Sequence, residues 1–259
     1  MRRLAAVGLL LIGAGCARPQ LQLPTDTGTP VSDASAIHAT VAAACAPVRT
    51  LTGEFALAGR AGRQRMRGRL IAGLARPASM RLEGVAPFGP PVFILTAGPD
   101  GAVLVLPRDR RVVRAPAARD ILGAITGLSW EPDDLLAVLT GCVEPDPMVV
   151  SGLRHRGGWV TLQLRGGTTL YVEPLGSRWR VRAATRDRWQ VVYDEWTTTF
   201  PSRIGIRSRS DATVDLVVTV TQSEANVAID QTAFRATLPP DAEPMSLDEL
   251  RAAWPLGEP

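Results

Sequence analysis

From Val48 to Val220, apolar and polar side chains alternate in short segments that turn residues separate. The clearest segments are Val160–Leu164 and 214–220, where every second side chain is aliphatic. Because successive side chains of a strand point to opposite faces, this period indicates antiparallel strands with one buried and one solvated face. Signals such as Pro99-Asp100-Gly101 and Gly166-Gly167 separate the segments at hairpin spacing. We expect roughly 10–11 strands.

Helical patterns occur at two places in this β-rich chain. A first helix is expected up to Ala44, capped by Ser32 or Asp33, with Ile37 and Val41 on one face. Two short helices are expected over 117–126 and 131–140. A long sheet with one apolar face must curl or be covered, so the predicted fold is mainly β: a barrel or half-barrel with helices against its concavity.

The N-terminus has the layout of an export signal. Two Arg precede an apolar run over 4–12, which is shorter than the roughly 20 residues that cross a bilayer. Gly13-Ala14-Gly15 then leads into Cys16, and this pattern resembles the lipobox of bacterial lipoproteins. The resemblance implies cleavage before Cys16, lipid on Cys16 and, because Ala17 follows, attachment to the outer membrane facing the periplasm. The alternative is an ordinary signal peptide in which this Cys is accidental.

The expected organisation has four parts: a signal peptide over 1–15, a lipidated Cys and flexible tether over 16–31, a domain over 32–238, and a C-terminal extension over 239–259. The tether carries three Pro and few large apolar side chains, so we expect it to be extended and solvated. Loss of the signal peptide removes two of the 29 basic residues and lowers the net charge from +4 to +2. A polyanionic partner is therefore weakly supported.

Catalytic patterns are absent from the sequence. There is no nucleophile elbow, zincin His pair, phosphate-binding loop or CxxC motif, so we expect neither an enzyme nor a metal or cofactor site. His38 and His155 are expected to be exposed structural residues. Asp133 and Asp134 lie at a helix start, where the helix dipole accounts for them.

Five Arg occur within residues 59–69, and Arg63, Arg65, Arg67 and Arg69 share one face of a predicted strand. No aromatic residue is interleaved, which argues against nucleic-acid binding. A solvated hairpin and contact with anionic lipid headgroups both remain open.

Two further features stand out. Cys45 and Cys142 remain as an even pair in an exported chain, so a disulfide and two buried free thiols are both open. Pro87 and Gly89 flank Phe88 at a predicted loop tip, where a soluble protein normally has polar residues. Phe88 either projects from this loop or folds back onto the core.

The chain resembles the LolA/LolB-like lipoprotein-localisation group along most of its mature length, and most closely its LolB-like outer-membrane lipoproteins. The segments that carry the resemblance are Arg81-Leu82, Pro87-Phe88-Gly89, 103–106, 121–128, Val138-Leu139-Thr140-Gly141, Arg188-Trp189-Gln190-Val191-Val192-Tyr193 and Pro201. Phe88 stands where the family usually has Leu, and the Pro-rich tether and the C-terminal extension are departures.

The resemblance implies a half-open antiparallel barrel with a helical lid over a hydrophobic cavity. It implies that the protein receives acylated lipoproteins from a periplasmic LolA-like carrier and inserts them into the outer membrane, with Pro87, Phe88 and Gly89 as the insertion loop. Partners would be membrane lipid, through Cys16, and acyl chains; we expect a monomer. Alternation nominates as cavity-lining residues Val160, Leu162, Leu170, Val172, Leu216 and Val218. Two alternatives remain: a carrier of glycolipid or another envelope lipid, and a structural or regulatory lipoprotein with a closed core.

Overall fold

The computed structural model describes residues 21–253 except 63, 143–147, 187 and 210–213. In this part of the chain, the four α-helices are α1 (Ala34–Cys45), α2 (Ala118–Thr126), α3 (Pro132–Thr140) and α4 (Leu247–Ala253). The strands are β1 (Thr29–Pro30), β2 (Thr50–Ala61), β3 (Gln64–Ala75), β4 (Ser79–Val85), β5 (Phe93–Gly98), β6 (Gly101–Leu106), β7 (Arg111–Ala115), β8 (Val149–Arg154), β9 (Val160–Leu164), β10 (Thr169–Leu175), β11 (Arg178–Arg186), β12 (Trp189–Trp196), β13 (Pro201–Ser208), β14 (Val214–Ala225) and β15 (Glu243–Pro244). Two short 3-10 helices are η1 (Arg156–Gly158) and η2 (Gln231–Phe234).

All described strands belong to one sheet in the order β1-β8-β9-β10-β11-β12-β13-β14-β2-β3-β4-β5-β6-β7-β15. Neighbouring strands are antiparallel except β15, which runs parallel to β7. The edges, β1 and β15, do not pair with each other, so the sheet is open. The predicted half-open antiparallel barrel is confirmed. The 15 strands exceed the predicted number partly because β1 and β15 have only two residues each.

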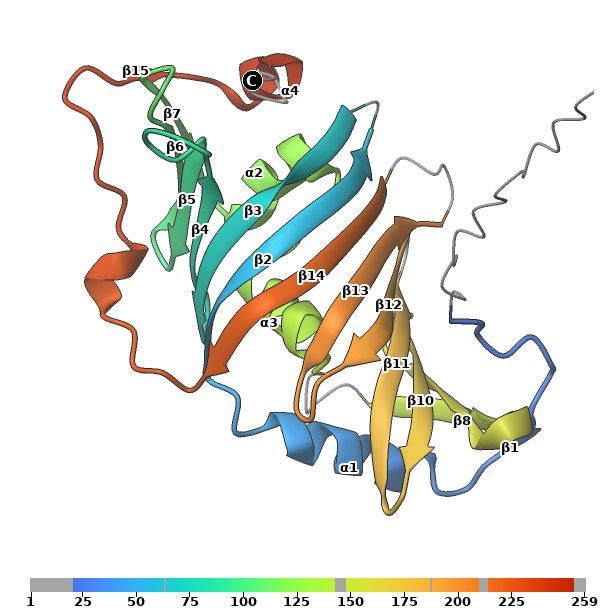
Figure 1. Cartoon of the computed structure of the whole chain (residues 1–259). Helices are drawn as coiled ribbons and strands as arrows, with labels where there is room; N and C mark the ends of the chain where they lie inside the picture. The colour runs from blue at the N-terminus through green and yellow to red at the C-terminus, as the bar shows by residue number, and fades with distance from the viewer. Residues whose placement is uncertain (1–20, 63, 143–147, 187, 210–213, 254–259) are drawn as a thin grey trace, which may run out of the picture.

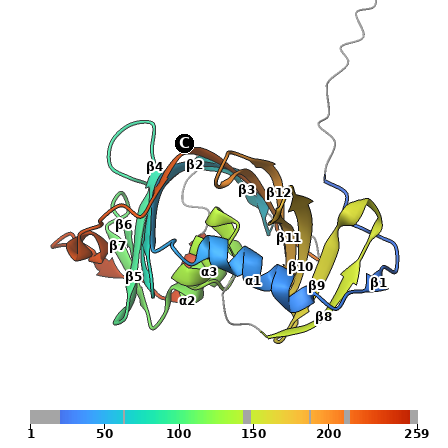
Figure 2. The same ribbon diagram turned by 90° about the horizontal axis from the view of Figure 1, so that it is seen from below.

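The sheet bends into an arch over the helices (Figure 2). Figure 1 views the convex side, with α2 and α3 behind β2, β3 and β14. We call the concave side the inner face and the convex side the outer face. Helix α1 packs against β8 and β11, α2 against β6 and β7, and α3 against β3 and β13. The helical lid expected over the concavity is therefore present.

The inner face holds one continuous apolar core. Along β14, Val214, Leu216 and Val218 are at most 7% exposed, whereas the intervening Asp215 is exposed. The same alternation runs through most of the sheet and joins it to the buried faces of the helices. Burial of this apolar surface is the main source of stability for the fold.

Local signals explain where the helices begin and end. Pro132 occupies the first turn of α3, and the backbone N–H of Glu131 donates to Asp134 Oδ2 over 2.9 Å. Gly127 after α2 and Gly141 after α3 adopt left-handed conformations with φ of 77° and 65°. Glycine adopts this conformation at little cost, so both residues end their helices.

A disulfide joins Cys45, the last residue of α1, to Cys142, two residues beyond α3. The Cα atoms are 5.4 Å apart, and the two residues are separated by 97 positions in the chain. Two of the helices that cover the inner face are therefore covalently linked.

The described part of the C-terminal extension packs on the domain. Strand β15 pairs with β7, and α4 packs against α2 and β7. Leu250 of α4 is fully buried, and Glu249 Oε2 accepts hydrogen bonds from the backbone N–H and hydroxyl of Ser246 at the start of the helix. This segment extends the hydrophobic core of the sheet.

Candidate lipid-binding and membrane-facing site

The six residues nominated as cavity lining lie on the inner face. Val160 and Leu162 belong to β9, Leu170 and Val172 to β10, and Leu216 and Val218 to β14. Each is at most 7% exposed and belongs to the same apolar core. Their side chains are packed together with the other core residues in this structure.

The inner face becomes open along β2 and β3. Register places Leu57, Met66 and Leu70 on the same face as the buried Val218 and Phe55, yet these three residues are only partly buried. Gly68 lies opposite Leu57 and is exposed, and a Cβ placed on Gly68 would have nothing within 4 Å. Apolar inner-face surface is thus accessible beside the β2–β3 connection. We call this region the inner opening.

Aromatic residues that the sequence analysis did not nominate also belong to the interior. Trp130 packs edge-on against Trp189, with ring centroids 5.5 Å apart, and Tyr193 packs against Trp196 at 5.7 Å. The indole N–H groups of Trp130 and Trp196 are buried and have no hydrogen-bond partner among the described residues. Burial raises the pKa of the Tyr193 hydroxyl, so this group is neutral at physiological pH. The interior therefore contains hydrogen-bond donors in an apolar setting.

The loop between β4 and β5 projects from the arch beside β4 (Figure 2). Phe88 in this loop is 89% exposed, and Pro87 and Gly89 are exposed beside it. The loop closes through the N–H of Val92, which donates to Gly84 O over 2.9 Å. Arg108 Nη2 donates to Phe88 O over 2.8 Å, so the β6–β7 turn supports the loop. A large apolar side chain is held in solvent.

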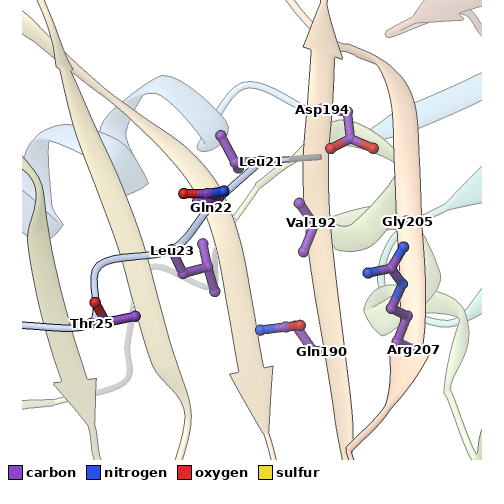
Figure 3. A pocket seen from close by; sticks show the side chains of 9 residues that line it. All are labelled: Leu21, Gln22, Leu23, Thr25, Gln190, Val192, Asp194, Gly205 and Arg207. Carbon is purple, nitrogen blue, oxygen red and sulfur yellow. The ribbon is translucent and has the colours of Figure 1, made fainter. Parts of the chain in front are cut away.

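The N-terminal segment lies along the outer face. Residues 21–25 run beside β12, where Leu21, Gln22, Leu23 and Thr25 line one side of a pocket of about 450 Å³ (Figure 3). The other side is lined by β12 and β13, through Gln190, Val192, Asp194, Gly205 and Arg207. The described part of the tether therefore contacts the domain, unlike the solvated segment that its composition predicts. Cys16 lies outside the described residues.

Both histidines differ from the prediction that they are exposed. His38 on α1 is 5% exposed, and burial lowers its pKa. The His155 side chain is 6% exposed, with Nδ1 2.6 Å from Asp26 Oδ1 and Nε2 3.0 Å from Thr161 Oγ1. Local sequence patterns do not predict these contacts, because Asp26 is 129 residues from His155.

The remaining charged candidates lie at the start of α3 and on the outer face of β3. Asp134 accepts from the N–H of Glu131 at the start of α3, and Asp133 pairs with Arg76 over 3.2 Å. Arg65, Arg67 and Arg69 share the outer face of β3, as predicted, and Arg63 lies outside the described residues. Among the residues that the structure describes, no cluster of His, Cys, Asp or Glu could hold a metal ion. Within the same ranges, no helix has the length and apolar character needed to cross a membrane.

Comparison with known proteins identifies solved structures with the same fold. No protein-family model matches the sequence, and no curated protein matches it significantly. A LolA superfamily protein from Nitrosomonas europaea superposes with a TM-score of 0.52 and 11% identity, over 77% of this chain and 96% of that one. A domain assigned to outer membrane lipoprotein sorting from Vibrio parahaemolyticus gives 0.51 and 9%, over 78% and 97%.

A third similar structure is a DUF1329 family protein from Desulfovibrio piger, with a TM-score of 0.52 and 9% identity, over 80% of this chain and 98% of that one. These likenesses span nearly the whole length of the three solved proteins, while the sequence identities are very low. They establish the architecture of the chain. The described domain shares its fold with these three solved proteins.

Proposed function

We propose that this protein is a non-enzymatic lipid carrier of the cell envelope, anchored through Cys16 to the outer membrane and facing the periplasm. It would receive the acyl chains of lipoproteins on its inner face, from a LolA-like carrier, and help to insert them into the membrane. The observation that carries the proposal is the apolar inner face, which runs from the buried core to the inner opening beside β2 and β3.

Acyl chains require an apolar surface and no catalyst. Each methylene group removed from water contributes about 0.8 kcal/mol, so a chain of ordinary length gains enough to bind tightly. Because the six nominated residues are packed in this structure, a full-length chain must displace part of the helical cover. Helices α1 and α3 are linked by the Cys45–Cys142 disulfide and would move together.

The buried indole N–H groups suit an acyl ester or amide. Indole nitrogen is a donor only, and a buried donor without an acceptor costs about 1–3 kcal/mol. A carbonyl oxygen at the head of an acyl chain would accept from Trp130 or Trp196 and remove this cost. This arrangement favours acylated ligands over plain hydrocarbons.

Phe88 would act at the membrane. Exposed aromatic side chains on a rigid loop partition into the boundary between headgroups and acyl chains. Phe88 is 89% exposed and is supported by the hydrogen bond from Arg108. Insertion of this side chain would bring the carrier into contact with the bilayer at the moment of transfer.

Gly68→Trp tests the inner opening. The site has space for the new side chain, so we expect a folded protein that loses most of the lipid copurifying with the parent chain, as measured by mass spectrometry. Gly98→Trp is the matched control, because a Cβ at Gly98 also meets nothing within 4 Å but lies away from the inner face. Equal lipid content in both variants would contradict the proposal.

Phe88→Glu tests the insertion loop separately. We expect a large loss in the rate of lipoprotein delivery to membranes, because a carboxylate is costly to place among acyl chains. Phe88→Leu should retain delivery, since it keeps the apolar character. If Phe88→Glu delivers lipoproteins at the normal rate, the insertion role of this loop is wrong.

A structural lipoprotein with a closed core is the second candidate function. The dense packing of the six nominated residues favours it. This candidate predicts no copurifying lipid and no effect of Gly68→Trp on any lipid-dependent measurement. A lipid other than an acylated protein, such as a glycolipid, would be identified in the same mass spectra.

A further inference from the structure

Three connections of the sheet lie at one end. Consecutive antiparallel strands alternate in direction, so the β2–β3 connection, the β4–β5 loop and the β6–β7 turn share an end. Two contacts confirm this arrangement: Arg69 of β3 pairs in register with Val85 at the start of the loop, and Arg108 of the turn donates to Phe88 O. The exposed Phe88 therefore lies at the same end of the sheet as the arginine-rich hairpin.

The outer face of this hairpin carries a cluster of exposed arginines. Arg60 of β2 and Arg65 of β3 are directly opposite each other in the register, and Arg67 is two residues further along β3. The inner opening occupies the other face of the same two strands. One hairpin thus presents an apolar inner surface and a cationic outer surface at the end of the sheet where the Phe88 loop also lies.

These arginines differ from the others nearby in having no acidic partner. Arg69 pairs with Glu54 over 2.9 Å, and Arg207 pairs with Asp215 over 3.1 Å. Within the described ranges, no ion pair or hydrogen bond of the Arg60, Arg65 or Arg67 side chain is present. Like charges directly opposite in a sheet are destabilising. An anion between Arg60 and Arg65 would remove this repulsion.

We propose that Arg60, Arg65, Arg67 and Arg108 form a docking surface for the headgroups of an anionic phospholipid bilayer. The charge complementarity is local, since the chain as a whole has a net charge of only +4, or +2 without residues 1–15. Guanidinium groups bind phosphate oxygens in a bidentate geometry. Because the hairpin and the Phe88 loop lie at the same end of the sheet, phosphates bound by these arginines and the inserted Phe88 would belong to the same bilayer.

This surface deepens the proposed function by naming the lipid class at which the carrier docks. It rests on the membrane role of the Phe88 loop and not on the binding of acyl chains to the inner face. The two can therefore be tested apart: docking is measured on vesicles without cargo, and acyl binding is measured without vesicles.

The test uses the chain from residue 16 onward, which contains every described element, with Cys16→Ser so that no lipid is attached. Sedimentation measures its binding to vesicles of phosphatidylcholine alone or mixed with phosphatidylglycerol. We expect clear binding only to the mixed vesicles, and weaker binding as salt is added. Each arginine near an anionic surface is worth about fivefold in affinity, so Arg65→Gln/Arg67→Gln should weaken binding about 25-fold.

Arg49→Gln/Arg178→Gln is the matched control. Both residues are exposed: Arg49 immediately precedes β2 and Arg178 is the first residue of β11, so both lie at the end of the sheet opposite to the β2–β3 connection. The variant therefore has the same net charge without altering the docking surface. An equal loss of binding in both double variants would show that vesicle binding depends on the net charge alone, and would overturn the proposal. Unchanged binding in Arg65→Gln/Arg67→Gln would overturn it as well, and would favour an acidic protein as the partner of these arginines.

Discussion

His155 Nδ1 donates a hydrogen bond of 2.6 Å to Asp26 Oδ1 and so fixes the N-terminal segment to the connection between β8 and β9. The N–H groups of Gly28 and Arg156 donate to the same carboxylate over 3.0 and 3.2 Å. On the other side of the ring, His155 Nε2 lies 3.0 Å from Thr161 Oγ1. The path from the proposed anchor at Cys16 is therefore set along the outer face before the first helix begins.

Replacement of Asp26 by Asn should release this segment. Amide hydrogen exchange over residues 21–30 is expected to rise about tenfold at neutral pH, because local opening no longer breaks a charged hydrogen bond. Asp241→Asn is a suitable control, since Asp241 also pairs with a basic side chain, that of Arg110, but lies at the other edge of the sheet. Exchange in 21–30 that is equal in the two variants would show that Asp26 does not hold the segment.

Acid should release the same contact. The hydrogen bonds from His155 and from the N–H of Arg156 lower the pKa of Asp26 below its usual value of 3.8. A carboxyl with a lowered pKa stabilises the folded form above its usual pKa, and this contribution is lost as the pH falls through the lowered value. Nuclear magnetic resonance of the 21–30 amides should therefore show release only at pH below 3.8, and Asp26→Asn should remove that transition.

The disulfide should contribute strongly to stability. It closes a loop of 97 residues, and the chain-entropy model gives about 4–5 kcal/mol for loops of this size. Cys45→Ser/Cys142→Ser is expected to lower the free energy of unfolding in urea by about 2–5 kcal/mol. Reduction of the parent chain should give a similar loss. A change below about 0.5 kcal/mol in both experiments would contradict this prediction.

The C-terminal segment should be part of the cooperative fold. Leu250→Ala removes a fully buried side chain between α4 and its neighbours, at a cost of about 2 kcal/mol or more. Leu238→Ala, at a position 37% exposed, should change the unfolding free energy by less than about 0.5 kcal/mol. Equal effects of the two substitutions would mean that α4 is not coupled to the core.

Much of this architecture follows from local sequence signals. The short helices were predicted within one residue of α2 and α3, because Pro132, Gly127 and Gly141 act on the backbone next to them. Strand faces followed from the period of two, which placed Leu162 and Leu216 inward. Such signals depend only on neighbouring residues, so they can be interpreted without knowledge of the whole fold.

Other features depend on contacts between distant parts of the chain. In β10–β11 the register shifts between Tyr171 and Val172, which breaks the simple alternation. Ala183 and Thr185 of β11 lie on the outer face, because they pair with Val192 and Gln190, whose side chains line the outer-face pocket. Both residues are nevertheless buried. No local sequence pattern predicts that these outer-face residues are buried.

The docking surface and the insertion loop also combine features that local sequence predicts with features that depend on distant contacts. The turn around Phe88 could be predicted, because Pro87 and Gly89 restrict the backbone locally, but the sequence left open whether Phe88 projects from the loop or folds back onto the core. That Arg108 would support Phe88 could not be predicted, since it requires the β6–β7 turn to lie beside the loop. The opening at Gly68 likewise depends on where the helices end above β2 and β3.

Burial of His38 should make the stability of the domain fall in mild acid. Desolvation lowers the pKa of His38 in the folded protein below its usual value of 6.5, and its Nε2 atom has no hydrogen-bond partner among the described residues. Below pH 6.5 the unfolded chain therefore binds a proton that the folded chain does not, so the free energy of unfolding decreases as the pH falls. His38→Leu keeps the side chain apolar and should abolish this decrease. Urea unfolding at about pH 7 and about pH 5 measures the difference; an equal decrease in His38→Leu and in the parent chain would assign the effect to other groups.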